Sequence, residues 1–394
     1  MMIEQEHNNV QWKKVKLGDV CAPSSEKYNP LTENDFSSCI EMENINQESG
    51  TINGKSDITK LLSLKNKFHK GEVLYGKLRP YLRKYWLSDC EGACSTEIWV
   101  LKSAEGIDNQ FLFYLFQSDF INKIANLSSG TKMPRADWAF MKNQQLFIPF
   151  KNNKPDLSAQ RRIAAILTSA DKVIAATQKT IAKYKQIKQG MMEDLLKPKE
   201  GWKKVRLGEV GEIITGPFGS SLHEKDYTKT GTPIVNPQNI VNGRIIPMDK
   251  CLVSDETVER LCKFKMNAGD IVIARRGEMG RCAVVEENQE GWLCGTGSFV
   301  IKVDSEKIDS NFIQLQLSSD NTKIILENNS IGATMSNLNQ GILCELEFLV
   351  PDLPEQRRIA KMLSGIDRKI AAEEKVLEKY EKMKKGLMER MLNK

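Results

Sequence analysis

The chain of 394 residues repeats itself, and this repeat limits its possible folds more than any other feature. Residues 160–167 read QRRIAAIL, and residues 356–363 read QRRIAKML. Two further pairs of blocks recur in the same order: QWKKVKLGDV at 11–20 with GWKKVRLGEV at 201–210, and KYKQIKQGMMEDLL at 183–196 with KYEKMKKGLMERML at 379–392. Chance does not place three matched blocks in one order, so the sequence indicates an internal duplication.

The positions of the repeated blocks predict four segments. We expect a globular domain over residues 1–155, a helix over 156–200, a second domain over 201–352 and a second helix over 353–394. The blocks stay similar while the sequence between them has diverged. This contrast indicates that the two halves share one task and differ in another.

Both repeated tails have the hydrophobic spacing of a long helix that packs against another helix. Their apolar residues alternate at intervals of four and three, the a/d pattern of a coiled coil, with polar exceptions at the same two places in both tails. We predict a subunit-interface seam formed by Ile163, Leu167, Ile174, Ile181, Ile359, Leu363, Ile366, Ile370 and Leu377. A helix of about 40 residues spans roughly 60 Å.

The direction of the helices follows from connectivity. If the two helices pair antiparallel, the second ends beside the first domain, near Trp12, and the chain forms a pseudo-two-fold symmetric coiled-coil stalk. The alternative is that each helix packs only on its own domain. Gly190 and Gly386 occupy equivalent places in the two tails, and we interpret them as sites of close approach or bending.

The globular halves have a mixed pattern, which predicts the α+β class. Short apolar runs such as EVLYGKL at 72–78 and SFVIKV at 298–303 are typical of strands. Amphipathic runs at 111–127 and 312–328 each predict one helix.

Composition excludes several classes of protein. No apolar run approaches the length of a membrane-spanning helix, and MMIEQEHNNV at the N-terminus lacks the features of a secretory signal. Nine cysteines without repeated spacing predict reduced thiols and a cytoplasmic location. The three histidines have no partners at metal-ligand spacing, so we expect no metal site.

The sequence shows no recognisable catalytic site. The run NPQN at 236–239 lacks the second proline and the aromatic residue of a base-flipping methyltransferase, and no GxxxxGK[ST] loop occurs. Asp352, Glu373 and Lys375 could suggest a nuclease, but their place on a predicted helix start and face favours solvated surface. We therefore expect a protein without catalytic activity.

The charge pattern favours DNA binding through local clusters. The net charge is +6, yet residues 1–150 are neutral overall and residues 201–353 carry −5. Cations gather in KNKFHKGEVLYGKLRPYLRKYW at 65–86 and ARRGEMGR at 274–281, where Arg can pair with guanine and Tyr can stack. The candidate DNA-binding residues are Lys77, Arg79, Tyr81, Arg83, Lys84, Lys132, Arg135, Ser220, Ser221, Gln238, Asn239, Arg275, Arg276, Arg281, Asn337 and Asn339. A single cluster of this kind is more typical of a solvated loop, but recurrence in both halves favours a binding role.

Taken together, these motifs resemble the specificity subunit of a type I restriction–modification system, the HsdS family. The resemblance rests on the following segments: KGEVLYGKLRPYLRK at 70–84, CSTEIWVL at 94–101, GPFGSSL at 216–222, AGDIVIARRGEMGRCAVV at 268–285, GATMSNLNQ at 332–340 and PDLPEQRRIAKML at 351–363. The first half departs from the pattern, with Pro134 and Arg135 where the second half has Ser336 and Asn337. The resemblance covers nearly the whole chain.

The resemblance implies a division of labour. Each globular half is expected to be a target-recognition domain that reads one half of a split site in double-stranded DNA. The helices are expected to hold two modification subunits, with restriction subunits joining through the complex. Cofactors are expected only on those partners, namely S-adenosylmethionine, ATP and magnesium.

Two other functions remain open from sequence alone. A specificity module of another restriction–modification type would show the same motifs, and the neighbouring genes would distinguish it. A repeat scaffold that does not bind DNA is the second, and a gel-shift experiment with the assembled complex would distinguish that.

Overall fold

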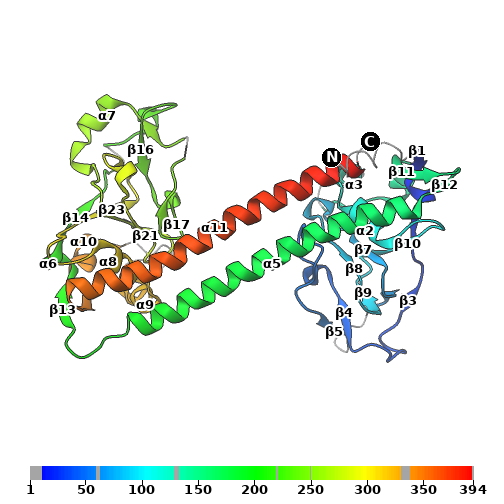
Figure 1. Cartoon of the computed structure of the whole chain (residues 1–394), viewed down its shortest axis with the longest axis horizontal. Coiled ribbons are helices and arrows are strands. Elements are labelled where there is room, and N and C mark those ends of the chain that lie inside the picture. Colours follow the sequence, from blue (N-terminus) through cyan, green and yellow to red (C-terminus); the bar gives the residue numbers. More distant parts are fainter. Residues whose placement is uncertain are drawn as a thin grey trace. The chain divides into compact units, whose positions relative to one another are not determined.

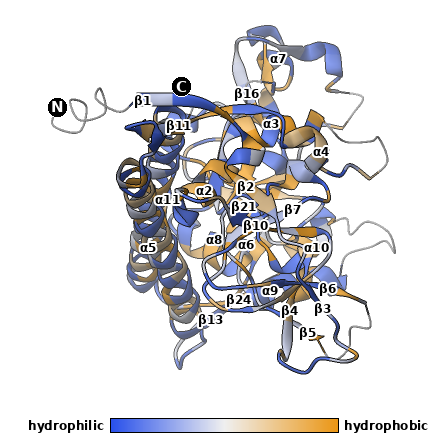
Figure 2. Cartoon of the chain, turned by 90° about the vertical axis from the view of Figure 1, so that its right-hand side faces the viewer, coloured by the Kyte–Doolittle hydropathy of each residue, from blue (hydrophilic) through white to orange (hydrophobic). Residues whose placement is uncertain are grey.

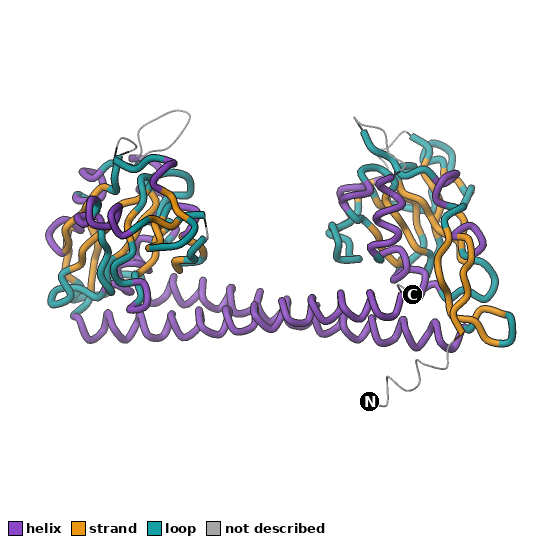
Figure 3. Tube along the Cα trace, turned by 90° about the horizontal axis from the view of Figure 1, so that it is seen from above, coloured by secondary structure: helices purple, strands orange, loops and turns teal. Residues whose placement is uncertain are grey.

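The computed structural model describes residues 11–58, 63–127, 133–218, 221–248, 250–329 and 338–392, which form two compact units (Figure 1). The first unit takes in residues 1–179 and 374–394, and the second takes in residues 180–373. Both units draw on both long helices, α5 (Leu157–Leu195) and α11 (Leu353–Leu392). The two predicted helices are confirmed, at 39 and 40 residues, and Figure 3 shows each without a break.

The first unit is built on three sheets. A four-stranded antiparallel sheet has the order β2 (Cys21–Pro23), β10 (Ile98–Ser103), β7 (Val73–Gly76), β8 (Tyr85–Leu87). A five-stranded mixed sheet has the order β3 (Lys27–Tyr28), β6 (Lys65–Phe68), β9 (Gly92–Cys94), β4 (Ser38–Ile40), β5 (Ser56–Asp57). The third has the order β1 (Gln11–Lys16), β11 (Gln145–Lys151), β12 (Lys154–Pro155).

The second unit repeats this plan with different loops. Its central antiparallel sheet has the order β14 (Gly211–Thr215), β23 (Ser298–Val303), β20 (Ile271–Ala274), β21 (Cys282–Val284), which matches the four-stranded sheet of the first unit. The strand pair β13 (Lys203–Arg206) and β24 (Glu347–Val350) corresponds to β1 and β11. The remaining strands are β15 (Tyr227–Thr228), β19 (Leu252–Val253), β16 (Thr232–Val235) and β22 (Leu293–Cys294) in one sheet, and β17 (Ile240–Val241) and β18 (Arg244–Ile245) in another. The duplication read from the sequence thus extends to strand order, and the α+β class is confirmed.

Each of the two predicted amphipathic helices is in fact a pair of helices. The first run forms α2 (Asn109–Gln117) and α3 (Asp119–Leu127), and the second forms α8 (Ser310–Leu317) and α9 (Asp320–Asn329). At the first break, Ser118 has extended backbone (φ −65°, ψ 151°), and its hydroxyl accepts a hydrogen bond from the amide of Ile121. A serine that caps a new first turn ends one helix and starts another. The shorter helices are α4 (Trp138–Met141), α6 (Leu207–Val210), α7 (Asp255–Arg260) and α10 (Gln340–Cys344).

The far end of each long helix completes the core of the other domain's unit. In the first unit, Met391 and Leu392 of α11 are buried in one cluster with Ile163 and Leu167 of α5, and Trp12 packs against it. In the second unit, Leu196 shares a cluster with Ile359 and Leu363. Figure 2 shows hydrophobic positions scattered among hydrophilic ones along α5 and α11.

In the described ranges, no helix is both long enough and apolar enough to cross a bilayer.

In each helix, one of the two polar exceptions to the hydrophobic spacing is a lysine that forms an ion pair. In the first unit, Lys384 Nζ lies 2.6 Å from Asp171 Oδ1, with 14% and 33% of the side chains exposed. In the second unit, Lys188 Nζ lies 2.7 Å from Asp367 Oδ1. The two lysines are separated by 196 positions, as are the two aspartates. The two units therefore join the helices by equivalent contacts.

The predicted seam is buried inside the chain. Ile163, Leu167, Ile359 and Leu363 are at most 2% exposed, while Ile181 and Ile370 are 7% and 8% exposed. Ile174, Ile366 and Leu377 are partly buried. Ile163 and Leu167 pack in the core of the first unit, and Ile359 and Leu363 pack in the core of the second.

The interpretation of Gly190 and Gly386 as close-approach sites is wrong within the chain. A Cβ added at either glycine meets no described atom within 4 Å. Both helices also continue through these positions as unbroken α-helix. The open space around both glycines lies on the outside of the helices.

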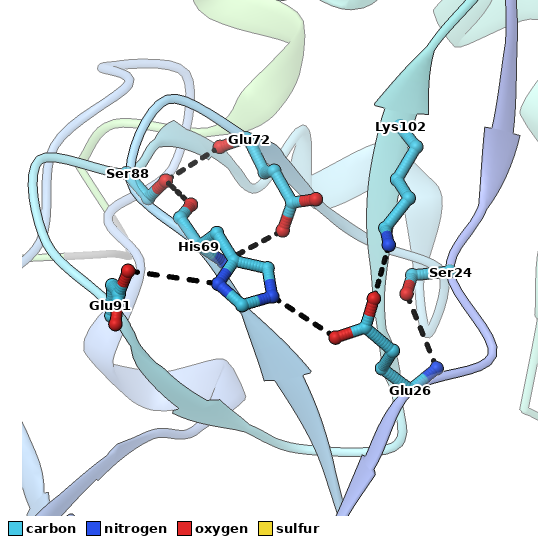
Figure 4. A network of polar contacts seen from close by, with 7 residues as sticks. All are labelled: Ser24, Glu26, His69, Glu72, Ser88, Glu91 and Lys102. Carbon is cyan, nitrogen blue, oxygen red and sulfur yellow. Dashed lines mark hydrogen bonds and ion pairs between the residues drawn. The ribbon is translucent and has the colours of Figure 1, made fainter.

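One histidine joins separate loops of the first unit (Figure 4). His69 Nε2 lies 3.0 Å from Glu26 Oε2, and His69 Nδ1 lies 3.7 Å from Glu91 Oε1. The backbone amide of His69 donates to Glu72 Oε2 at 2.7 Å, and Lys102 pairs with Glu26. The hydrogen bond to Glu26 raises the pKa of His69 above its usual value. Lys102 and then His69 lower the pKa of Glu26 to about 2.

The buried face of α11 predicts a contrast between neighbouring substitutions. Leu363 is fully buried in the second unit's core, and Met362 beside it is 40% exposed. Leu363→Ala should lower the free energy of unfolding by about 2–5 kcal/mol, because it leaves a cavity. Met362→Ala should change it by no more than about 0.5 kcal/mol. Urea unfolding followed by circular dichroism measures both, and equal effects would show that the buried face is wrongly assigned.

The His69 contacts predict a stability difference that depends on pH. A histidine whose pKa is raised by folding stabilises the fold fully below about pH 6.5, and this contribution is lost as pH rises through the raised pKa. The Glu26 contribution is present above about pH 4.3 and is lost as pH falls towards 2. The difference in unfolding free energy between the native chain and His69→Asn should therefore be largest near pH 5.5 and shrink towards pH 8.5. Urea unfolding at constant ionic strength measures it, and a difference independent of pH would contradict the assignment.

Candidate nucleic-acid interface

The candidate interface consists of one loop in each unit that connects the central pair of strands. Arginine loop 1 (residues 77–83) joins β7 to β8, and arginine loop 2 (residues 275–280) joins β20 to β21. The amide of Gly76 donates to the carbonyl of Lys84, and the amide of Ala274 donates to the carbonyl of Arg281, both at 2.8 Å. The two loops therefore leave and rejoin their sheets in the same way.

A second segment of chain lies beside each loop. The amide of Ala136 donates to the carbonyl of Lys77 at 2.8 Å, and the amide of Arg79 donates to the carbonyl of Pro134 at 2.7 Å. In the second unit, the amide of Leu338 donates to the carbonyl of Arg275 at 3.1 Å. The parts of the motifs SGTKMPR and GATMSNLNQ that the structure describes, residues 133–135 and 338–340, thus lie against the two arginine loops.

Lys84 and Arg281 fasten the loops to the fold. Lys84 Nζ donates to the carbonyl of Met42 at 2.6 Å, and Arg281 Nη1 donates to the carbonyl of Pro237 at 3.4 Å. Met42 and Pro237 each begin a short 3-10 turn, over Met42–Asn44 and Pro237–Asn239. We name these two contacts the loop braces. Both cations were expected to contact DNA, but the structure gives them an internal role that sequence could not reveal.

Three further predicted arginines also have partners inside their unit. Arg83 Nη1 lies 2.7 Å from Asp119 Oδ1, and its side chain is only 20% exposed. Arg135 donates twice to the Glu97 carboxylate, at 3.0 and 3.3 Å. Arg275 Nε donates to the carbonyl of Leu338 at 3.3 Å, and its guanidinium lies 5.6 Å from the centre of the Phe299 ring. Arg135 remains half exposed, so pairing with Glu97 leaves it accessible.

Asn239, Asn339 and Ser221, which were predicted to bind DNA, form hydrogen bonds within their own unit. Asn239 is 1% exposed, its Oδ1 accepts from the amide of Asn236, and its Nδ2 donates to the carbonyl of Ile246. A side chain buried in this way cannot reach DNA without local rearrangement. Asn339 caps α10 by accepting from the amide of Ile342 at 2.9 Å, and the amide of Ser221 donates to the carbonyl of Phe218. Asn339 is nevertheless exposed.

A smaller set of predicted residues is available at the surface. Lys77, Arg79 and Arg276 have no side-chain hydrogen bond or ion pair with any residue that the structure describes, and Arg79 and Arg276 are exposed. Tyr81 is 53% exposed, between Arg79 and Arg83. Gln238 is exposed and has only a long contact, of 3.8 Å, with Cys251 Sγ. Lys132, Ser220 and Asn337 lie outside the described residues.

The backbone of arginine loop 1 is fixed in an unusual conformation. Arg79 and Arg83 have φ of 50° and 49°, the left-handed region that residues other than glycine seldom adopt. They flank a 3-10 turn over Pro80–Leu82, in which Pro80 is buried. Left-handed backbone at a non-glycine residue is retained where the surrounding contacts hold it. The loop therefore presents Arg79 and Tyr81 from a defined position.

Among the described residues, no group of three or more His, Cys, Asp or Glu side chains is placed to hold a metal ion. A cavity of about 1020 Å³ lies in the second unit, lined by residues of α5, α9 and the β17–β18 turn. Its lining mixes polar and apolar side chains and includes Glu278, which pairs with both Arg281 and Lys323. It does not contain the exposed cation Arg276.

Comparisons with known proteins agree with these features. The sequence profile of the type I restriction modification DNA specificity domain matches residues 9–186 and again residues 199–382. The chain is 25% identical over 322 residues to the MjaVIII specificity subunit, from a type I restriction enzyme of Methanocaldococcus jannaschii, a match that covers 76% of this chain and 72% of that protein. It is 25% identical over 190 residues to the EcoDI specificity subunit of Escherichia coli, covering 46% of this chain and 40% of that protein.

Solved structures show the same fold. The S subunit of the type I restriction–modification system from M. genitalium superposes with a TM-score of 0.63 at 16% identity, over 98% of this chain and 97% of that one. A chain from work on complex assembly and conformational transition of a type I restriction–modification system superposes with a TM-score of 0.57 at 21% identity, over 96% and 97%. Because the domain profile covers both halves, the chain belongs to the family of type I restriction–modification DNA specificity subunits and carries two copies of the family's domain.

Proposed function

We propose that each unit of this chain reads one half of a bipartite DNA site through its arginine loop, and that the long helices dock the modification subunits. The observation that carries this proposal is the repeated loop geometry with different exposed side chains. Loop 1 presents Lys77, Arg79 and Tyr81, whereas loop 2 presents Arg276. Two loops with the same backbone connections and different exposed side chains suit two domains that recognise different DNA sequences.

The exposed groups have the chemistry that DNA recognition needs. A guanidinium can neutralise a phosphate or donate two hydrogen bonds to guanine in the major groove. Tyr81 can stack or donate to a phosphate, and the exposed amide of Gln238 can pair with adenine. The globular part of the second half is net negative, so its affinity for DNA must come from a few placed cations such as Arg276.

We further propose that α5 and α11 form an antiparallel coiled-coil stalk with pseudo-two-fold symmetry. The equivalent ion pairs Lys384–Asp171 and Lys188–Asp367 support this arrangement. The predicted segments 1–155, 156–200, 201–352 and 353–394 belong to the same proposal. Half-sites about one turn apart, roughly 10–10.5 base pairs, or a multiple of this, would suit two readers on one face of the duplex.

The outer faces of the helices carry two equivalent patches that suit two copies of one partner. Ile187 is 39% exposed and Met383, 196 positions later, is 50% exposed. Each lies three residues before a glycine with open space around its Cβ position, Gly190 or Gly386. A glycine on an open helix face lets another backbone approach closely. The two helical tails carry +4 and +5, which suits a partner with an acidic surface.

Methylation, ATP hydrolysis and cleavage are assigned to partner subunits in this proposal. S-adenosylmethionine, ATP and magnesium would bind there, and the chain itself would act without catalysis or a cofactor. The proposal thus joins double-stranded DNA, two modification subunits and, through the complex, the restriction subunits. S-adenosylmethionine-dependent methylation by the purified chain alone would contradict it.

Substitution of the exposed arginines should alter one half of the site at a time. Arg79→Ala should weaken recognition of one half-site, and Arg276→Ala should weaken recognition of the other. Loss of a base contact should cost about 1–3 kcal/mol and relax one position, whereas loss of a phosphate contact should weaken all sequences alike and reduce the salt slope by about 1. Titration of the assembled complex with a set of singly substituted duplexes, at two salt concentrations, measures both.

Arg358→Ala is a matched control for the arginine substitutions. Arg358 is an exposed arginine on α11 that pairs with Glu355 and lies outside both loops. It should change neither affinity nor sequence preference. If Arg79→Ala and Arg276→Ala behave like this control, the loops do not form the interface.

Charge placed in the helix patches should remove partners one at a time. Ile187→Asp and Met383→Asp lie on exposed positions, so the fold should tolerate both. Each should weaken one docking site by about 2 kcal/mol or more, as expected for a central apolar contact, and the pair together should weaken both. Light scattering of the chain mixed with purified modification subunit gives the stoichiometry, with Met362→Asp as an exposed control on α11. If both single variants and the double variant still bind two modification subunits, the patches are not the docking sites.

A further inference from the structure

Gln117 forms a polar junction inside the first unit, between arginine loop 1 and the long helices. It is the last residue of α2 and is 2% exposed. Its carbonyl accepts from Arg83 Nη2 at 2.5 Å, and its Oε1 accepts from Lys384 Nζ at 3.1 Å. Its Nε2 is buried without a hydrogen-bond partner among the described residues. One residue therefore contacts both the loop and α11.

On the loop side, Arg83 connects the loop to the junction between α2 and α3. Besides the Gln117 carbonyl, its guanidinium contacts Asp119 in the first turn of α3, and its Nε lies 3.5 Å from Glu48. A cation at the carbonyl end of a helix and a carboxylate in a helix's first turn are both favoured by the helix dipoles. Arg83 also ends the 3-10 turn that contains Tyr81. The positions of Arg79 and Tyr81 thus depend on this anchor.

On the helix side, Lys384 connects three helices. Its Nζ pairs with Asp171 of α5 and lies 5.8 Å from the centre of the Tyr114 ring of α2. The Tyr114 hydroxyl donates to Asp171 Oδ2 at 2.8 Å. An ammonium with 14% of its side chain exposed needs such partners, since burial of an unpaired charge is costly. Lys384 therefore sets where the end of α2 lies against α5 and α11.

The second unit connects its helices to its arginine loop differently. Lys188 makes the equivalent ion pair with Asp367, but in the described residues it has no hydrogen bond to α8. The sequence at the end of α8 reads LSSD at 317–320, where the first unit has FQSD at 116–119. The Ser318 hydroxyl bonds only within its own helix, to the carbonyls of Gln314 and Leu315. The second unit instead uses Gln189 of α5, whose Nε2 donates to Asp320 Oδ2 of α9 at 3.2 Å, and Lys323 of α9, which lies 3.7 Å from Glu278 of arginine loop 2. A path that starts at the seam lysine is thus a feature of the first unit.

We propose that Lys384 is a positioning residue for the first half-site: through Gln117 it fixes the α2–α3 junction, and through Arg83 that junction fixes arginine loop 1. This inference rests on the proposed reading role of the loop. It adds a residue on α11, far along the sequence from the loop, to the determinants of DNA specificity.

Two substitutions interrupt the path at different points. Gln117→Leu removes the acceptor of Lys384, keeps the carbonyl that holds Arg83 and removes the unpaired Nε2, so the fold should not be weakened. Lys384→Met keeps the aliphatic stem over Tyr114 and removes the charge. Lys384→Arg should restore function in part, because a guanidinium can reach the same acceptors. Lys188→Met is the matched control, since it removes the equivalent ion pair in the unit where the lysine does not reach the junction of the two short helices.

The readout is the discrimination of the assembled complex between its duplex and duplexes with one base pair changed in either half. The site is first mapped by sequencing the methylated adenines of cells that express the system. Gln117→Leu and Lys384→Met should each lower discrimination in one half-site by between about threefold and thirtyfold, the range for mutations along coupled contacts, and leave the other half unchanged. Lys188→Met should leave discrimination in that first half unchanged. Thermal unfolding of each variant separates a positioning effect from general destabilisation.

The outcomes distinguish this inference from the proposed function. If Arg79→Ala lowers discrimination while Gln117→Leu and Lys384→Met do not, the loop reads DNA but is not positioned by Lys384, and the inference is wrong. If none of the three lowers it, the loop does not read DNA and the proposed function fails with it. If Lys188→Met lowers the same half as Lys384→Met, the effect comes from the helix pair in general and the specific path is overturned.

Discussion

A lysine on each long helix reaches an aspartate on the other helix, and both lysines occupy positions where the hydrophobic spacing would otherwise place an apolar residue. A polar residue in such a seam stabilises less than an apolar one, but it accepts only the pairing that satisfies its charge. The pair in each unit therefore favours the helix contact seen in that unit. Met391 of α11 lies in the first unit's core and Leu196, just after α5, lies in the second, so each domain depends on a segment that follows the other.

The two halves use one backbone frame for different surface chemistry. The central sheets have the same strand order, the loops leave and rejoin them through the same hydrogen bonds, and the loop braces hold both loops on a 3-10 turn. Between these fixed points the exposed side chains differ. In loop 1, Arg79 and Arg83 have left-handed backbone and lie on either side of the exposed Tyr81. Loop 2 instead turns at Gly277 and Gly280, which both have positive φ. The two loops therefore hold the same place in their units but expose different side chains.

The sequence predicted the features that depend on local periodicity, and missed those that depend on distant partners. The duplication, the long helices and the main strands follow from spacing alone. The break at Ser118 was missed because apolar residues continue on both sides of it. Which cations are free could not be predicted, since Lys84 bonds to a main-chain oxygen 42 positions away and Arg83 to a carboxylate 36 positions away. Basic composition therefore overestimated how many side chains of these loops are available at the surface.

The loop braces end on main-chain oxygens, and this has a consequence for how new members of the family arise. Every residue type supplies the same oxygen, so the side chains at positions 42 and 237 can change without loss of the brace. Each brace also lies wholly within one domain. A domain inherited by recombination from another lineage therefore brings its own loop, turn and brace together. Such a chimaera needs no compensating substitution for the brace itself, so the frame of the loop survives the exchange.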